Sequence, residues 1–166
     1  ADKAIRIDAD AKDAFYVAHQ LATVCTGYDL IFAGVEASDY NGAAVGGMLA
    51  ELLDIQSVSA VSGLQLDGQS VKITREIEGG SQSLSVNTPV MAIVQKGIAK
   101  EPRIPAMRGI MMARSKPLEV LQPVETETRV SFASFDLPPA KAACKKYTEE
   151  QAKELIHALH EVAKVL

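Results

Sequence analysis

The chain has 166 residues, of which 17 are Lys or Arg and 21 are Asp or Glu, so its formal net charge is −4. This balance lacks the basic surplus that is typical of dedicated nucleic-acid-binding domains. No apolar run approaches the roughly 20 residues that span a bilayer, so we expect no direct membrane insertion. Two cysteines form neither a disulfide framework nor a metal-binding spacing. They fit a reducing compartment, and we expect a cytoplasmic location, or the mitochondrial matrix in a eukaryote.

The first third of the chain alternates strand and helix patterns. Residues 3–7 predict a short strand, and apolar residues at helical spacing predict a helix over 11–26 that begins after Asp10 as its N-cap. The continuous apolar run 29–33 is typical of a strand buried on both faces of a parallel sheet. A polar loop and a predicted helix over 43–53 follow it. This order of elements predicts an α/β fold.

The middle of the chain changes to strands connected by short turns. The predicted strands are residues 58–66, 71–77, 83–86 and 90–94. Asp67-Gly68 and Gly79-Gly80 lie where hairpin turns belong. We therefore expect a mixed sheet in which an antiparallel hairpin section extends the parallel strands.

The last third of the chain carries fewer regular patterns. Residues 95–108 contain too many prolines for a regular helix or an internal strand, 110–114 predict one or two helical turns, and 130–135 predict a late strand. Thr148 and Gln151 predict a capping box that opens a C-terminal amphipathic helix. Pro138-Pro139 breaks the chain, so we divide it into a domain over 1–137 and a linker with a helical arm over 138–166.

The sequence contains no P-loop, nucleophile elbow, Gly-x-Gly-x-x-Gly or His-Glu-x-x-His motif, and it offers no metal-ligand set. We therefore predict no catalytic residue and no metal site. The best ligand candidate is the loop after the strand at 29–33, because ligands gather at the carboxyl ends of strands in open α/β sheets. Backbone N–H groups of Ala43, Ala44 and Val45 would attract an anion such as phosphate. The alternative is an ordinary connection between a strand and a helix.

The second candidate is the proline-stiffened loop over 97–108. Ile98 and Ile104 lie there among charged residues, as an apolar docking anchor within a polar rim would. In the alternative interpretation, one of these isoleucines is buried in the core of the chain itself.

Several segments together resemble the β subunit of the electron transfer flavoproteins. Residues 32–39 with Val45-Gly46 resemble its adenine-nucleotide loop, and Arg75 to Gly80 resembles its signature segment. Glu101-Pro102-Arg103 resembles its recognition loop, and Pro138-Pro139 with the last helix is similar to its C-terminal arm. The resemblance covers essentially the whole chain in the family's order. Ala1 to Ala4 resembles a stretch inside the family's domain, which roughly another half of this length precedes. We therefore expect the sequence to be part of a longer chain.

The resemblance implies a Rossmann-like nucleotide-binding fold with a mixed sheet and a C-terminal helical arm that packs on a partner subunit. It also implies a non-catalytic electron carrier, the β half of an αβ heterodimer. In this family the α subunit holds most of the FAD, and the β subunit binds AMP. The pair carries electrons from flavin-dependent dehydrogenases to an acceptor. The flavin supplies the redox chemistry, so no side chain of the β subunit has to react.

The resemblance also implies roles for particular residues. The nucleotide would contact Gly34, Val35, Glu36, Ala37, Ser38, Asp39, Ala43, Ala44, Val45 and Gly46. The dehydrogenase would dock on Ile98, Ala99, Lys100, Glu101 and Arg103, with Ile98 or Ala99 as the anchor.

The chain departs from the family's pattern in the nucleotide loop. Many members have Gln where Ala44 stands, so one side-chain hydrogen bond is absent. Bifurcating members have Asp-Gly-Asp-Thr where this chain has Asp39-Tyr40-Asn41-Gly42, which favours AMP or an empty site over a second FAD. The alternative from another class is a stand-alone adenine-nucleotide sensor of the universal-stress type.

Overall fold

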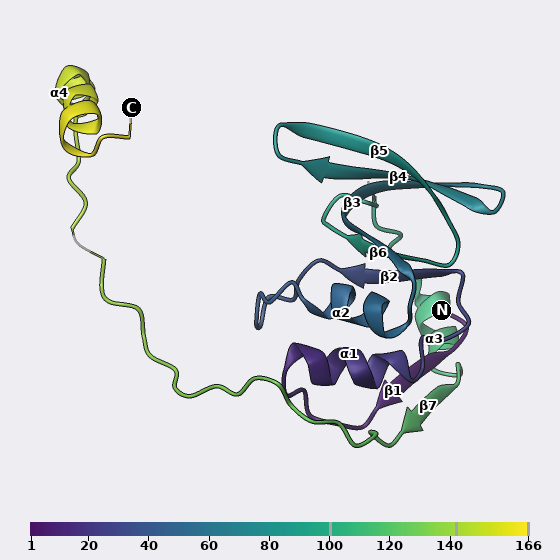
Figure 1. Cartoon of the computed structure of the whole chain (residues 1–166). Coiled ribbons are helices and arrows are strands. Elements are labelled where there is room, and N and C mark those ends of the chain that lie inside the picture. Colours follow the sequence, from purple (N-terminus) through teal and green to yellow (C-terminus); the bar gives the residue numbers. More distant parts are fainter. Residues whose placement is uncertain (100, 142, 166) are drawn as a thin grey trace. The chain divides into compact units, whose positions relative to one another are not determined.

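The computed structural model describes residues 1–99, 101–141 and 143–165 (Figure 1). The chain divides into two compact units, Ala1–Ser131 and Phe132–Leu166, and each is described by itself.

The first unit is built on a mixed five-stranded sheet. Its strands lie in the order β2 (Leu30–Gly34), β6 (Val90–Val94), β3 (Gln56–Asp67), β4 (Ser70–Ile77) and β5 (Gly80–Asn87). β6 pairs in parallel with β2 and with β3, whereas β4 pairs antiparallel with β3 and with β5. Gly68 and Gly79 have φ of +63° and +81° in the two hairpin turns. The structure therefore confirms the mixed α/β fold with a hairpin section.

The long strand β3 changes partners along its length. Its first half pairs in parallel with β6, and its second half pairs antiparallel with β4. The register shifts between Val58 and Val61, and Ala60 lies between them with a φ of +56°. Such an irregularity bends a strand and increases its twist. The bend lets one strand belong to both the parallel and the antiparallel sections of the sheet.

Two helices cover one face of the parallel section. They are α1 (Ala14–Ala22) and α2 (Val45–Leu52). The buried cluster on this face consists of Ala18 from α1, Leu49 and Ala50 from α2, and Met91 and Ile93 from β6. A second buried cluster combines residues of three strands, namely Val58, Val61, Val71, Ile73, Val90 and Ala92.

The structure corrects the predicted starts of both helices. The N-cap of α1 is Asp13 rather than Asp10, because the Asp13 carboxylate accepts the Tyr16 N–H at 2.7 Å. The helix that we expected over 11–26 is therefore shorter. α2 begins at Val45, two residues later than predicted. Ala43 has a φ of +47°, a left-handed conformation that cannot continue into a right-handed helix.

A second sheet of two parallel strands pairs β1 (Ala4–Ile7) with β7 (Leu118–Leu121). β1 confirms the predicted first strand, whereas β7 was not predicted. The Lys3–Glu119 ion pair and a Lys116–Asp2 pair of 3.0 Å accompany this sheet. These pairs are exposed, so they contribute little to stability. The parallel partner of β7 is more than a hundred residues away, which explains why local patterning did not predict it.

The chain between the two sheets includes α3 (Met107–Ala113), which carries no buried residue. The late strand predicted over 130–135 is wrong. The Val130 N–H donates to the Asp13 carboxylate at 2.8 Å instead of to a neighbouring strand. Phe132 stacks on Phe135 with ring centroids 5.1 Å apart, so these side chains lie on the same side of the backbone. In a β-strand, side chains three positions apart, such as these two, would point to opposite faces of the sheet.

The second unit ends in a helical segment. It comprises η1 (Glu149–Gln151), α4 (Ala152–His157) and a π-helical turn, η2 (Ala158–Val162). The capping box is confirmed, with the Thr148 N–H donating to Gln151 Oε1 at 3.1 Å. Across the described ranges, no helix is both long and apolar enough to cross a membrane.

Candidate functional site

The predicted nucleotide loop connects the carboxyl end of β2 to the start of α2. Val35 extends the β2 ladder, because its N–H donates to the Val94 carbonyl at 2.9 Å. A turn follows, in which the Asn41 N–H donates to the Ala37 carbonyl at 2.9 Å. The first predicted stretch, Gly34 to Asp39, leads into this turn, and the second, Ala43 to Gly46, follows it and includes the start of α2. The loop therefore follows the carboxyl end of a parallel strand, which is the position where ligands bind in open α/β sheets.

The loop is exposed along most of its length. Glu36 to Ala43 are exposed, whereas Val35, Ala44 and Val45 are half-buried. Asn41 and Ala43 both have positive φ, at +48° and +47°. Asn adopts this conformation readily, but for alanine it costs about 1–2 kcal/mol. The backbone here is therefore held in a specific, unfavourable shape beside the helix start.

The start of α2 has no side-chain cap. Its N-cap residue is Ala44, which carries no oxygen to accept a hydrogen bond from the first turn. The first N–H groups of a helix have no intrahelical acceptor, and the helix dipole makes this end positive. An anion at this position would satisfy those groups.

Gly46 has a packing role that the sequence did not indicate. It is buried, and a Cβ atom added there would lie 3.0 Å from Ile93 Cγ1 and 3.3 Å from Ala33 Cβ. The absence of a side chain lets α2 approach β2 and β6 closely. The neighbouring Gly47 faces open space, because no atom lies within 4 Å of an added Cβ.

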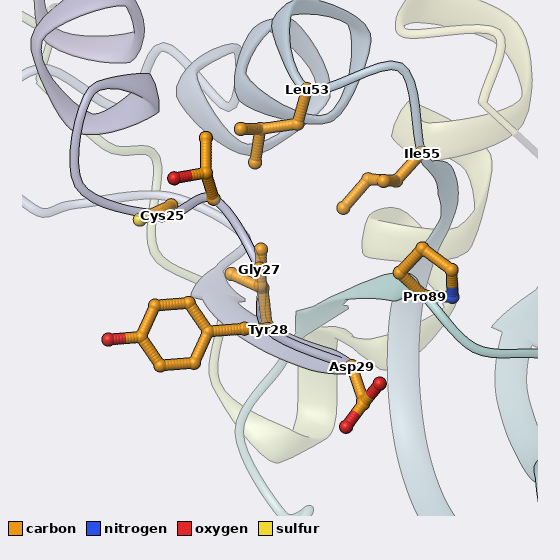
Figure 2. A pocket seen from close by; sticks show the side chains of 9 residues that line it. Cys25, Gly27, Tyr28, Asp29, Leu53, Ile55 and Pro89 are labelled. Atoms are coloured by element: carbon orange, nitrogen blue, oxygen red, sulfur yellow. The ribbon is translucent and has the colours of Figure 1, made fainter.

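A hollow of about 350 Å³ lies at the opposite end of the parallel strands (Figure 2). Asp29, Ile55 and Pro89 line it, and they immediately precede β2, β3 and β6. It therefore lies at the amino ends of the parallel strands, away from the predicted loop. Cys25 also lines this hollow, and burial raises the pKa of its thiol. A raised pKa makes a thiol less nucleophilic at neutral pH, so this cysteine is suited to packing rather than to chemistry.

The two isoleucines of the predicted docking loop, Ile98 and Ile104, differ in burial. Ile98 is half-buried and packs against the cluster that contains Val58 and Val90. Ile104 is 88% exposed. Of the other predicted docking residues, Ala99, Glu101 and Arg103 are exposed, and Lys100 lies outside the described residues. The apolar tip that this loop presents is therefore Ile104, while Ile98 fastens the loop to the core.

Groups of three or more His, Cys, Asp or Glu side chains placed to hold a metal ion are absent from the described ranges. Sequence reasoning missed a different set of polar contacts, those of Asp13 and Gln20 with residues 124–130. Their partners lie more than a hundred positions away in the chain, so no local signal could have revealed them.

Comparison with known proteins identifies related chains. Residues 1–126 match the Electron transfer flavoprotein domain family. The "Electron transfer flavoprotein subunit beta" of Syntrophomonas wolfei is 35% identical over 154 residues, which cover 90% of this chain and 60% of that protein. The Bacillus subtilis protein of the same name is 35% identical over 149 residues, which cover 84% of this chain and 58% of that protein. The mouse protein of this name is 31% identical over 176 residues, which cover 99% of this chain and 68% of that protein. The chain thus spans about three fifths of the bacterial relatives.

Proposed function

The chain belongs to the electron transfer flavoprotein family, and from this premise we propose that it acts as the β subunit of a heterodimeric electron carrier. The relatives are named as subunits of an electron transfer protein rather than as enzymes. The match over residues 1–126 carries the proposal, because it includes both candidate loops. In this role the chain binds and orients cofactors, and the flavin performs the redox chemistry.

The proposed ligand of the chain itself is AMP, held by Gly34 to Asp39 and Ala43 to Gly46. Three observations support this site: its place at the carboxyl end of β2, its exposed backbone and the uncapped start of α2. The adenosine lies along the first stretch, and the phosphate accepts N–H groups from the second. Asp39-Tyr40-Asn41-Gly42 in place of Asp-Gly-Asp-Thr favours AMP over a second FAD.

The proposed partner is the α subunit, which holds most of the FAD. The second unit supports this assignment, because its helical segment exposes the apolar residues Leu155, Ile156 and Val162. Exposed apolar residues gathered on one short helical segment commonly mark a protein–protein interaction site. We assign residues 138–166 as the arm that packs on the α subunit.

The proposed electron donor is a flavin-dependent dehydrogenase that docks on the loop containing Ala99, Glu101, Arg103 and Ile104. The exposure of these residues supports this role, with Ile104 as an apolar anchor among charges. Ile98 contributes by holding the loop against the core.

The experiment is coexpression of this chain with the α subunit, followed by spectroscopy and nucleotide analysis. The purified pair is expected to show flavin absorbance in the visible blue, whereas this chain alone is expected to show none. Denaturing the pair should release AMP in an amount equal to that of the β chain. Stable flavin on the isolated chain would contradict the electron-carrier assignment. Calorimetric preference for ATP over AMP would favour a nucleotide sensor, and no released nucleotide would favour an empty site.

A further inference from the structure

Three of the five methionines of the chain lie on one short helix. Met107, Met111 and Met112 all belong to α3, on which no residue is buried. Their exposed fractions are 74%, 67% and 55%. The other two methionines are less accessible, since Met91 on β6 is fully buried and Met48 on α2 is 39% exposed. The accessible thioether groups are therefore concentrated on α3.

This methionine cluster continues the predicted docking loop. Met107 is the first residue of α3 and also belongs to the loop over 97–108. It lies three residues after Ile104, the exposed apolar tip of that loop. Met107 and Met111 are four residues apart, so their side chains share one face of the helix. The loop and the helix together present a continuous series of exposed apolar side chains.

The conformation of α3 depends mainly on its own residues. The helix has seven residues, and its N-cap, Ala106, makes no side-chain hydrogen bond to the first turn. Gly109 lies inside the helix, where glycine is the least favourable residue after proline. Helices of this length are marginal in water without packing contacts. A chemical change on the α3 side chains is therefore expected to alter this surface without disturbing the sheet.

We propose that Met107, Met111 and Met112 form a reversible oxidation site that weakens the docking of the flavin-dependent dehydrogenase. Methionine adapts well to partner surfaces, because its side chain is flexible and polarisable. Oxidation to the sulfoxide makes the side chain polar and disrupts methionine-rich interfaces. The inference rests on the proposed docking of a dehydrogenase and deepens it, because it names a chemical modification that regulates this surface.

The oxidant in this step is hydrogen peroxide. The methionine sulfur gives up two electrons and forms a bond to one peroxide oxygen, while the O–O bond breaks. The second oxygen leaves as water with both peroxide protons, so atoms and electrons balance. Methionine sulfoxide reductases, one for each sulfoxide epimer, restore the thioether. The core around Met91 keeps its sulfur away from peroxide in the solvent.

The first measurement follows the oxidation itself and needs no dehydrogenase. The complex of this chain with the α subunit is treated with hydrogen peroxide, and timed tryptic digests are analysed by mass spectrometry. Trypsin cleaves after Arg103, Arg108 and Arg114, which separates the peptide of Met107 from that of Met111 and Met112. We expect sulfoxide at all three methionines while Met91 is still unmodified. Oxidation of Met91 at the same rate would overturn the proposal.

The second measurement follows electron transfer by stopped-flow spectroscopy. After treatment, catalase removes the peroxide and dithiothreitol reduces oxidised cysteines. The complex is then mixed with an untreated flavin-dependent dehydrogenase that reduces the untreated complex. Oxidation should slow flavin reduction at least about tenfold, as the loss of a central apolar anchor would. The two sulfoxide reductases should restore the rate. An unchanged rate, or a loss that the reductases do not reverse, would overturn the proposal.

Two variants separate the methionines of α3 from every other oxidisable group. Met107→Leu/Met111→Leu/Met112→Leu removes the three thioethers and keeps apolar side chains of similar volume. Each protein is compared with its own untreated sample, so that differences in starting rate do not enter. The triple variant should keep its starting rate after peroxide, whereas the matched control Met48→Leu should lose as much as the original chain.

The α subunit is the same in all of these complexes, so damage to its own methionines would slow the triple variant as well. Equal losses in the triple variant and the original chain would therefore overturn the proposal. The failure of this inference differs from that of the proposed function. An untreated complex that no flavin-dependent dehydrogenase reduces would refute both, whereas rapid reduction of a complex that carries the three sulfoxides would refute this inference alone.

Discussion

Gln20 Nε2 donates to the Val124 carbonyl at 2.8 Å, and Gln20 Oε1 accepts the Val124 N–H at 2.9 Å. The same Nε2 donates to Thr126 Oγ1 at 3.0 Å. Gln20 is only 4% exposed, so its amide is buried with its hydrogen bonds satisfied by this one segment. Asp13, at the start of the same helix, accepts the N–H groups of Arg129 and Val130. α1 and its cap residue therefore hold residues 124–130, the stretch that precedes the second unit, through the hydrogen bonds of Gln20 and Asp13.

Replacing Gln20 with alanine should release this stretch. The Val124 N–H and C=O would lose their partners in a partly buried place, which costs about 1–3 kcal/mol of unfolding free energy. Trypsin should then cleave after Arg129 faster than in the original chain, as measured by mass spectrometry of timed digests. Gln65→Ala, at an exposed position of β3, is the control and should leave the digestion rate unchanged. Equal cleavage rates in both variants would show that Gln20 does not hold the segment.

The cap residue Asp13 should make stability depend on acidity. The hydrogen bond from the Tyr16 N–H, assisted by those from Val130 and Arg129, holds the pKa of Asp13 below its ordinary value. Its contribution is complete above the unfolded-state pKa of about 3.9 and is lost as the pH falls through the lower folded-state pKa. Between about pH 5 and pH 3, the melting temperature of the original chain should therefore fall more than that of Asp13→Asn. Asp10→Asn should follow the original chain, and identical slopes for all three proteins would refute the role of Asp13.

The two glycines at the start of α2 should respond in opposite ways to alanine. Gly46→Ala gains helix propensity of about 1 kcal/mol but forces a Cβ to 3.0 Å from Ile93 Cγ1, and overpacking typically costs about 1–3 kcal/mol. We expect a net loss of about 1 kcal/mol. Gly47→Ala meets no atom within 4 Å and should gain about 0.5–1 kcal/mol. Urea unfolding measures the change in unfolding free energy of both variants. A stabilised Gly46→Ala protein would show that Ile93 on β6 shifts readily to make room for the added Cβ.

The exposed Ile104 should matter for electron transfer and not for cofactor retention. In the complex with the α subunit, Ile104→Asp removes the apolar tip of the docking loop and should slow flavin reduction by the dehydrogenase about tenfold or more, as for a central anchor. Flavin content should be unchanged. Leu66→Asp, on the β3–β4 hairpin and also exposed, is the matched control and should transfer electrons at the original rate. Stopped-flow kinetics decide the outcome, and equal rates in both variants would remove Ile104 from the docking surface.

Local patterns predicted the elements whose geometry depends on adjacent residues. Asp67-Gly68 and Gly79-Gly80 marked the two hairpins, because few other residue pairs adopt those turns without strain. The apolar run ending at Ala33 marked β2, and Thr148 with Gln151 marked the start of the last helical segment. The place of the candidate nucleotide loop follows from the order of these elements alone.

Contacts between distant residues decided the rest. Asp13 rather than Asp10 caps α1, since the Asp13 carboxylate also accepts a hydrogen bond from the Val130 N–H, 117 positions away. β7 exists because β1 pairs with it, and Ile98 rather than Ile104 is buried because the strand cluster lies beneath it. Each of these outcomes depends on which groups folding brings together, and neither hydrophobic periodicity nor turn chemistry carries that information along the chain.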